Sequence, residues 1–232
     1  MRKKLDSKKD ILSQIYGDFP PTLSEADEAS LRSIFQEFLV GFSMMVDKGP
    51  FVSVFGSSRI TPEKLEYRLG VELGTGLAKL GYAVLTGGGP GLMEAVNKGA
   101  HEANGRSVGI NIAIPEEQEG NLYADPSITI NHFFVRKVLL LKYSTAYIFL
   151  PGGFGTLDEL FETVTLVQTK KIKPFPIILM RTEFWKGLID WMKERLEGEG
   201  LISGGDLNYL YLADSVAEAI GIIQGNAEMY ER

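Results

Sequence analysis

Pro151-Gly152-Gly153-Phe154-Gly155-Thr156-Leu157-Asp158-Glu159 is the stretch that decides the fold expected for this chain. The apolar run 145–150 precedes it and is typical of a buried strand, because Pro-Gly bounds the run. Apolar residues then recur at helical spacing and predict an amphipathic helix over 160–169. The glycines are therefore expected in a turn between a strand and a helix.

Such a turn is a binding site for an anion. Unpaired backbone N–H groups and the positive end of the helix dipole point at one place, and glycines let the anion approach the backbone closely. A phosphate group is the expected ligand. Glu159 lies one helical turn from that phosphate, where a carboxylate suits chemistry on the attached group better than anion binding.

Thr156 and Glu159 also have the spacing of a capping box. In that arrangement each side chain accepts a hydrogen bond from the backbone N–H of the other, and its role is purely structural. The pattern is common before an apolar run, so spacing alone leaves the structural and the functional interpretation equally supported.

Composition indicates a globular protein and excludes several classes. The chain has 232 residues, with 44% hydrophobic and 23% charged residues, enough for a sizeable core. A net charge of −6 with scattered basic residues disfavours nucleic acid as a partner. The absence of cysteine and the presence of only His101 and His132 argue against disulfides, a thiolate nucleophile and a zinc cluster.

The N-terminal part is expected to form an appendage. Residues 1–22 are polar and predict a loosely held arm, with no secretory signal, and no stretch approaches a membrane span. We therefore expect a cytoplasmic protein without a membrane partner. Apolar residues at helical spacing predict a helix from Ser24 to Asp47, which packs on its own domain or, less favoured, on a partner subunit. The expected division is 1–49 as arm and helix, and 50–232 as the main domain.

Strand and helix patterns alternate through the rest of the chain. Strands are expected at 51–55, 82–86, 107–112, 127–130, 145–150, 176–180 and 209–212. One helix is expected to begin at Pro62, and another, after the glycine turn at 87–89, to end at about Asn104. Further helices are expected over 133–143, 160–169, 183–197 and 214–224. This alternation predicts an α/β fold: a Rossmann-like, doubly wound, mostly parallel sheet with helices on both faces.

Three glycine turns should meet at one edge of that sheet, at Gly56, at 87–89 and at 152–155. Loops that converge at the carboxyl ends of parallel strands form a ligand crevice. Ser57 and Ser58 donate hydroxyls to a ligand or cap a loop, and Glu94 faces the crevice or caps its own helix; the sequence favours neither alternative. No G-x-G-x-x-G follows the first strand and no P-loop motif occurs, so NAD binding and nucleoside triphosphate hydrolysis lose support.

Three ordered motifs together resemble a known family. They are the P-G-G-x-G-T-x-x-E pattern of 151–159, the pair Arg136-Lys137, and the run 87–93. This combination, over about residues 50–180, is similar to the Lonely Guy family of nucleoside 5′-monophosphate phosphoribohydrolases, whose members were often labelled lysine decarboxylases. The resemblance implies hydrolysis of the N-glycosidic bond of a purine-type nucleotide, such as a cytokinin riboside monophosphate or AMP, to free base and ribose 5-phosphate.

The resemblance also implies roles for individual residues. Arg136 and Glu159 are the expected catalytic pair, and no cofactor is expected. The 5′-phosphate is expected at Gly152, Gly153, Gly155 and Thr156, and the rest of the nucleotide at Gly56, Ser57, Gly88, Gly89, Glu94 and Lys137. Members of the family resemble dimers with sites near the subunit interface, so a homodimer or higher homo-oligomer is expected.

The physical chemistry agrees with this reaction. Cleavage of a C1′–N bond develops positive charge on the ribose, which a fixed carboxylate at Glu159 stabilises while it orients a hydroxyl or activates water. Arg136 supplies a planar cationic fork for the phosphate or for the departing base, and the sequence leaves both open. Lys137 lies on a different helix face, where a solvated position is the alternative. His132 is a general acid or, more commonly, a cap or surface residue, and His101 is structural or exposed.

Two other functions compete with hydrolysis. A pyridoxal-phosphate decarboxylase is disfavoured because no Ser-x-His-Lys run is present. A non-hydrolytic nucleotide or molybdenum-cofactor carrier needs the glycines but not the carboxylate, so the presence of both Arg136 and Glu159 favours the enzyme. The N-terminal 50 residues and the loop 115–126 depart from the shortest family members, and the preferred base stays open.

Overall fold

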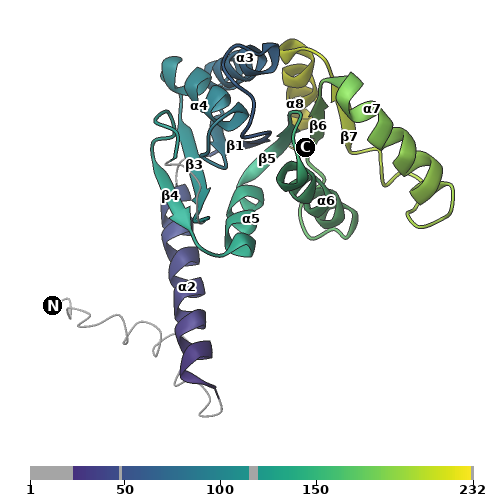
Figure 1. Cartoon of the computed structure of the whole chain (residues 1–232). Coiled ribbons are helices and arrows are strands. Elements are labelled where there is room, and N and C mark those ends of the chain that lie inside the picture. Colours follow the sequence, from purple (N-terminus) through teal and green to yellow (C-terminus); the bar gives the residue numbers. More distant parts are fainter. Residues whose placement is uncertain (1–22, 47–48, 115–119, 231–232) are drawn as a thin grey trace.

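A computed structural model describes residues 23–46, 49–114 and 120–230 of the chain. The described residues form one seven-stranded sheet in the order β4-β3-β2-β1-β5-β6-β7 (Figure 1). Its strands are β1 (Phe51–Phe55), β2 (Ala83–Thr86), β3 (Ser107–Ile112), β4 (Ser127–Ile130), β5 (Ser144–Phe149), β6 (Ile177–Met180) and β7 (Leu210–Ala213). Each pairing between neighbouring strands of this sheet is parallel. The predicted α/β fold is confirmed.

The strand order reverses beside β1. From β1 the chain builds outward to β4, and then returns to place β5 on the other side of β1. Ligands of doubly wound sheets bind outside the carboxyl ends of the strands at such a reversal. The crevice of this fold is therefore expected at the ends of β1 and β5.

Helices cover both faces of the sheet and enclose two cores (Figure 1). Alternate residues of β1 face opposite ways, since Val52 and Val54 belong to one core and Phe51 and Phe55 to the other. The first core is closed by α3 (Leu65–Lys79), α4 (Leu92–Glu102) and α8 (Val216–Tyr230). The second is closed by α2 (Glu25–Met45), α5 (Phe133–Lys142), α6 (Phe154–Gln168) and α7 (Thr182–Trp191).

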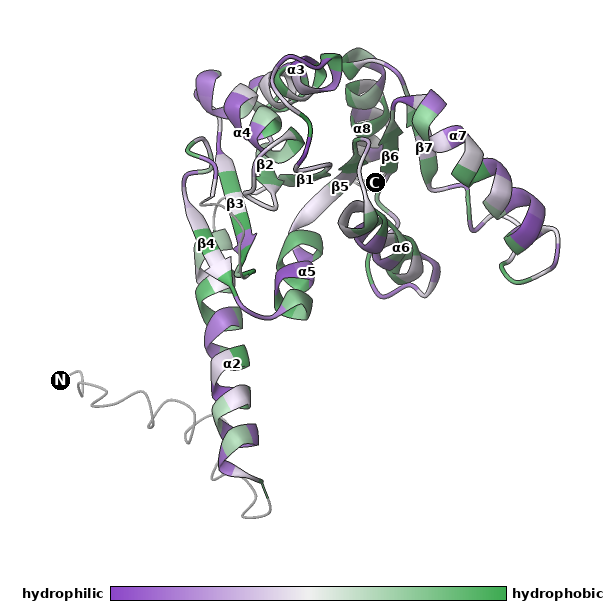
Figure 2. Ribbon diagram, viewed as in Figure 1, coloured by the Kyte–Doolittle hydropathy of each residue, from purple (hydrophilic) through white to green (hydrophobic). Residues whose placement is uncertain are grey.

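The N-terminal helix α2 packs on its own domain, as favoured from the sequence. Glu37, Gly41 and Met45 form its buried stripe at a spacing of four residues, and α5 lies against that part. Figure 2 shows α2 running past β4 and beyond the sheet, with hydrophobic residues along its projecting part. The arm expected at 1–22 and the helix end expected at Asp47 lie outside the described residues.

Several element boundaries differ from expectation, and the helix expected from Pro62 begins at Leu65. The helix expected over 160–169 begins at Phe154, because the glycines of the motif form its start despite their low helix propensity. The helix expected over 183–197 is α-helical only to Trp191 and continues as the π-helix η1 (Met192–Glu197). The last helix extends to Tyr230. Over the described ranges, no helix is both long and apolar enough to cross a membrane.

Candidate functional site

The three glycine turns meet at one edge of the sheet. They follow β2, β1 and β5, which are neighbours in the sheet and run in the same direction. The backbone N–H of Ser57 donates to the carbonyl of Pro151 at 3.1 Å, and the N–H of Leu92 donates to the carbonyl of Ser57 at 2.9 Å. The turn after β1 therefore joins the other two directly.

The glycine turn after β5 leaves the start of α6 uncovered. Gly153 is the N-cap residue, and it provides no side chain to satisfy the first N–H groups of the helix. Among the described residues, nothing lies within 4 Å of a Cβ built at Gly153 or at Gly155. The Thr156 side chain folds back over Gly152, where an added Cβ would overlap its hydroxyl. An anion can therefore approach these backbone donors.

The capping-box interpretation of Thr156 and Glu159 is wrong. Because Gly153 is the N-cap and α6 begins at Phe154, Thr156 is the third residue of the helix rather than its cap. Glu159 follows one turn later, inside the helix. Its carboxylate is not occupied in closing the first turn.

Glu159 is a buried carboxylate with an unsatisfied oxygen. The residue is 5% exposed, and its Oε2 has no hydrogen-bond partner within the described part of the chain. Burial raises the pKa of Glu159 to about 7, against the opposing charges of Arg136 and Lys137. A raised pKa, in a buried carboxylate with an unsatisfied oxygen, is typical of a functional residue.

Arg136 extends from α5 to the carboxyl ends of β3 and β2. Its Nε donates to the carbonyl of Ile110 at 2.8 Å, and an Nη donates to the carbonyl of Gly87 at 3.4 Å. A Cβ at Gly87 would overlap the guanidinium, so that glycine makes room for the arginine. The positive charge of Arg136 opposes the rise in the pKa of Glu159, so the two residues expected as the catalytic pair lie within electrostatic reach of each other.

Lys137 binds α6. Its Nζ lies 2.8 Å from Asp158 Oδ2 and 2.8 Å from Glu162 Oε2. Burial opposes its charge, but the hydrogen bonds to these two carboxylates outweigh burial and raise the pKa of Lys137. The lysine therefore holds α5 and α6 together and does not occupy the solvated position considered from the sequence.

A buried polar network holds the glycine turn after β2. Thr86 Oγ1 accepts from the N–H of Gly88 at 2.9 Å and donates to Asn97 Oδ1 at 2.5 Å. Asn121 Nδ2 donates to the carbonyl of Gly89 at 3.0 Å and to the same Asn97 oxygen at 3.1 Å. This network was not predicted from the sequence. The available signal was Asn97, a polar residue on the apolar side of a helix.

The glycines at 87–89 are needed because side chains of the protein pass close to them. Met93 lies over Gly87 and Gly89, and Asn111, on β3, lies against Gly88, so a Cβ at any of the three would collide. Asn111 was not singled out from the sequence. These side chains account for the run of three glycines.

The other candidates have protein partners of their own. Glu94 accepts a hydrogen bond from the Tyr67 hydroxyl at 2.6 Å, which holds α4 to α3. Ser57 Oγ accepts from the N–H of Arg59 at 3.1 Å, the loop-capping alternative for that serine. His101 is exposed and lies edge-on to the ring of Tyr123. Among the described residues, no group of three or more His, Asp or Glu side chains is arranged to hold a metal ion.

His132 stands at the N-cap position of α5, and its ring faces the N-terminal helix. Its Nδ1 lies 3.0 Å from Oε2 of Glu37, which also accepts from the His132 backbone N–H at 3.3 Å. The structure thus places this histidine in a contact between helices α2 and α5.

Comparisons with known proteins agree with the motifs. Residues 93–223 match the family described as possible lysine decarboxylase. Cytokinin riboside 5′-monophosphate phosphoribohydrolase LOG3 of Arabidopsis thaliana is 30% identical, over 83% of this chain and 90% of the relative. LOG1 of the same plant, also a cytokinin riboside 5′-monophosphate phosphoribohydrolase, is 28% identical over 73% of this chain and 80% of its own.

Solved structures share the fold. The molybdenum cofactor binding protein of the phototrophic bacterium Rippkaea orientalis superimposes with a TM-score of 0.59, covering 78% of this chain and 99% of that protein. At 23% identity this likeness concerns the fold alone. Taken with the motifs and the plant relatives, these matches show that the chain belongs to the Lonely Guy family, whose sequence signature carries the older description of possible lysine decarboxylase.

Proposed function

We propose that this protein hydrolyses the N-glycosidic bond of a purine-type nucleoside 5′-monophosphate, such as a cytokinin riboside monophosphate or AMP, to free base and ribose 5-phosphate. The single observation that carries the proposal is Glu159, a buried carboxylate with a pKa near 7. It lies one turn inside a helix whose start, without a side-chain cap, is open to a phosphate.

The reaction needs an anion site and a carboxylate at a fixed separation. The 5′-phosphate binds the N–H groups at Gly152, Gly153, Gly155 and Thr156, and the ribose then lies toward Glu159. As the C1′–N bond breaks, the base takes the electron pair and ribose C1′ becomes positive. The ionised Glu159 stabilises that charge and orients the water whose oxygen bonds to C1′, while a proton from water ends on the base.

Arg136 provides positive charge opposite this carboxylate. Its guanidinium is held by the carbonyls of Ile110 and Gly87, so its position is fixed before the substrate binds. It neutralises negative charge on the phosphate or on the departing base. The rest of the nucleotide is proposed to lie beside Gly56, Ser57, Gly88, Gly89, Glu94 and Lys137. Of these, Glu94 and Lys137 also make the protein contacts described above.

The alternative is a carrier that binds a nucleotide-like ligand without hydrolysing it. The similarity to the molybdenum cofactor binding protein extends to the fold and carries no function across. A carrier of an anion gains nothing from a buried carboxylate beside the phosphate, because its charge opposes binding. Glu159 therefore favours the enzyme.

We further propose a catalytic domain of residues 50–232, an accessory segment of residues 1–49 and assembly as a homo-oligomer. Large hydrophobic side chains that are exposed in the single chain support assembly. They are Leu31, Leu39 and Val40 on α2, Phe133, Phe134 and Val138 on α5, and Phe154 and Phe161 on α6. Exposed apolar surface beyond scattered single residues is typical of interfaces between proteins. Light scattering of the purified protein measures the assembly.

Incubation with a panel of nucleoside monophosphates, followed by chromatographic detection of free base, tests the activity. The account expects base and ribose 5-phosphate in equal amounts from at least one purine monophosphate, and much less from the matching nucleoside, which lacks the phosphate. If the protein binds a purine monophosphate tightly and releases no base from any member of the panel, the carrier is the correct function.

A further inference from the structure

Glu37, on the N-terminal helix, is a buried carboxylate that the proposed reaction does not use directly. Its Oε1 accepts from the backbone N–H of Asn131 at 3.1 Å and from the side-chain amide of Asn131 at 2.8 Å. Its Oε2 accepts from the N–H of His132 at 3.3 Å and lies 3.0 Å from the His132 ring. All of these partners belong to the two residues that precede α5.

The start of α5 lacks an anionic partner of its own. His132, the N-cap residue, makes no side-chain cap bond in the described part of the chain, and the first turn contains no acidic residue. A carboxylate at the positive end of a helix satisfies N–H groups and stabilises the dipole. Burial opposes ionisation of Glu37, but the hydrogen bonds from Asn131 and His132 outweigh it and lower its pKa. Glu37, although distant in sequence, thus caps the start of α5, which has no capping side chain of its own.

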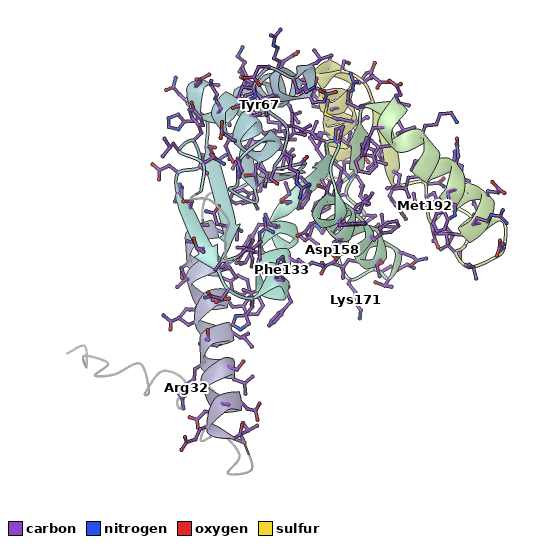
Figure 3. The ribbon with its side chains drawn as sticks, viewed as in Figure 1. Arg32, Tyr67, Phe133, Asp158, Lys171 and Met192 are labelled. Carbon is purple, nitrogen blue, oxygen red and sulfur yellow. The ribbon has the colours of Figure 1, made fainter. Side chains whose placement is uncertain are left out.

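The rest of α2 fixes where this carboxylate lies. Gly41, one turn after Glu37, packs so closely on α5 that an added Cβ would overlap the Leu139 side chain. Met45, one turn further, is part of the core. Arg32, five residues before Glu37, lies on the part of α2 that projects away from the sheet in Figure 3. Ile34, three residues before Glu37, still packs against the core, so the carboxylate is held within the part of α2 that contacts the domain.

The same short segment of α5 carries Arg136. The backbone N–H of Arg136 donates to the carbonyl of His132 at 3.2 Å, so the arginine lies one turn from the residue that Glu37 holds. We propose that Glu37 is a positioning residue for the reaction: by anchoring the first turn of α5, it fixes the Arg136 guanidinium in the crevice. This inference rests on the proposed function and gives the N-terminal helix a role in catalysis.

Kinetics on the full chain test the inference, with base release from a purine monophosphate as the readout. Glu37→Ala removes every contact to Asn131 and His132, and we expect kcat/KM to fall roughly tenfold or more, because small displacements of a catalytic group are costly. Glu37→Gln keeps one acceptor oxygen and should lose less. Gln36→Ala, at the neighbouring exposed position of α2, is the matched control and should retain the wild-type value.

A double-mutant cycle separates positioning from a general loss of structure. If Glu37 acts through Arg136, adding Glu37→Ala to Arg136→Ala should lower single-turnover kcat/KM by less than about twofold. The inference is overturned if the two effects multiply, or if Glu37→Ala equals wild type. Should Glu37→Ala not fold, the same cycle with Glu37→Gln decides, with the same outcomes. A wild-type protein that releases no base removes the proposed function and this inference with it, whereas an active wild type with an unaffected Glu37→Ala removes the inference alone.

Discussion

Substitution of Glu159 by glutamine should change how the stability of the protein depends on pH. In the folded protein, burial raises the pKa of this carboxyl from 4.5 to about 7. A raised carboxyl pKa means that the folded state holds a proton which the unfolded state releases. Its contribution to stability is fully present below pH 4.5 and is lost as the pH rises through about 7.

The size of the effect follows from the two pKa values. At pH 5 the folded carboxyl is almost fully protonated and the unfolded one is mostly ionised, whereas at pH 8 both are ionised. Through this group alone, the free energy of unfolding should fall by about 2.5 kcal/mol between pH 5 and pH 8. Glu159→Gln cannot ionise, so this component disappears. Any constant cost of burying the glutamine amide cancels when the two pH values are compared.

Urea unfolding of both proteins at pH 5 and pH 8 measures the effect. The quantity to compare is the free energy of unfolding of the wild type minus that of Glu159→Gln. This difference should be more positive at pH 5 than at pH 8 by about 2 to 3 kcal/mol. Other titrating groups contribute equally to both proteins and drop out. A difference that stays constant within about 0.5 kcal/mol would mean that Glu159 is ionised normally, and the reasoning from its burial would be refuted.

Three further substitutions test the geometry around this carboxylate. Gly87→Ala introduces a methyl group that overlaps the Arg136 guanidinium, and base release should fall roughly a hundredfold, measured as kcat/KM. Gly155→Ala adds a methyl group at the open start of α6, so thermal unfolding should show unchanged or slightly higher stability, while calorimetry should show roughly tenfold weaker AMP binding. Lys137→Met removes a charge that lowers the pKa of Glu159, so the rise of kcat/KM with pH should move to higher pH.

Each of these predictions has a control or a contrary outcome. Gly187→Ala, on α7, also meets open space and should leave AMP binding unchanged. Normal base release in Gly87→Ala would show that the position of Arg136 does not matter. Unaltered AMP binding in Gly155→Ala would move the phosphate elsewhere. The Lys137→Met profile should be followed above pH 6.5, where the second ionisation of the phosphate, near pH 6, is largely complete. A midpoint that stays in place or falls would contradict the predicted charge effect.

The sequence predicted the sheet and the meeting of its glycine turns because their signals are local. A buried strand followed by a glycine turn is visible in 145–155. Because the sheet is parallel, the three such turns lie at the same edge of it. The predicted start of α6 was too late, because the low helix propensity of Gly153 and Gly155 argues against a helix there. Thr156 and Glu159 looked like a capping box because spacing does not show where a helix begins.

The contacts that the sequence could not predict join distant parts of the chain. Glu37 and His132 are 95 positions apart, and neither residue belongs to a motif that indicates the other. Lys137 reaches across to Asp158, and Asn97 joins Thr86 to Asn121 below the glycine turn. Such pairs depend on how the helices pack over the sheet. The hydrophobic pattern shows which face of a helix is buried, but not which residues of two packed helices lie opposite each other.

Side-by-side measurement of AMP binding and adenine release, for wild type and Glu159→Gln, tests the central claim most directly. The account predicts that both proteins bind AMP with affinities that agree within a few-fold, because the glycine turn holds the phosphate in both. It predicts that Glu159→Gln releases adenine roughly a hundredfold or more slowly, the scale of lost acid–base assistance. Equal release by the two proteins would contradict the role given to Glu159, and binding without release by wild type would contradict the hydrolase itself.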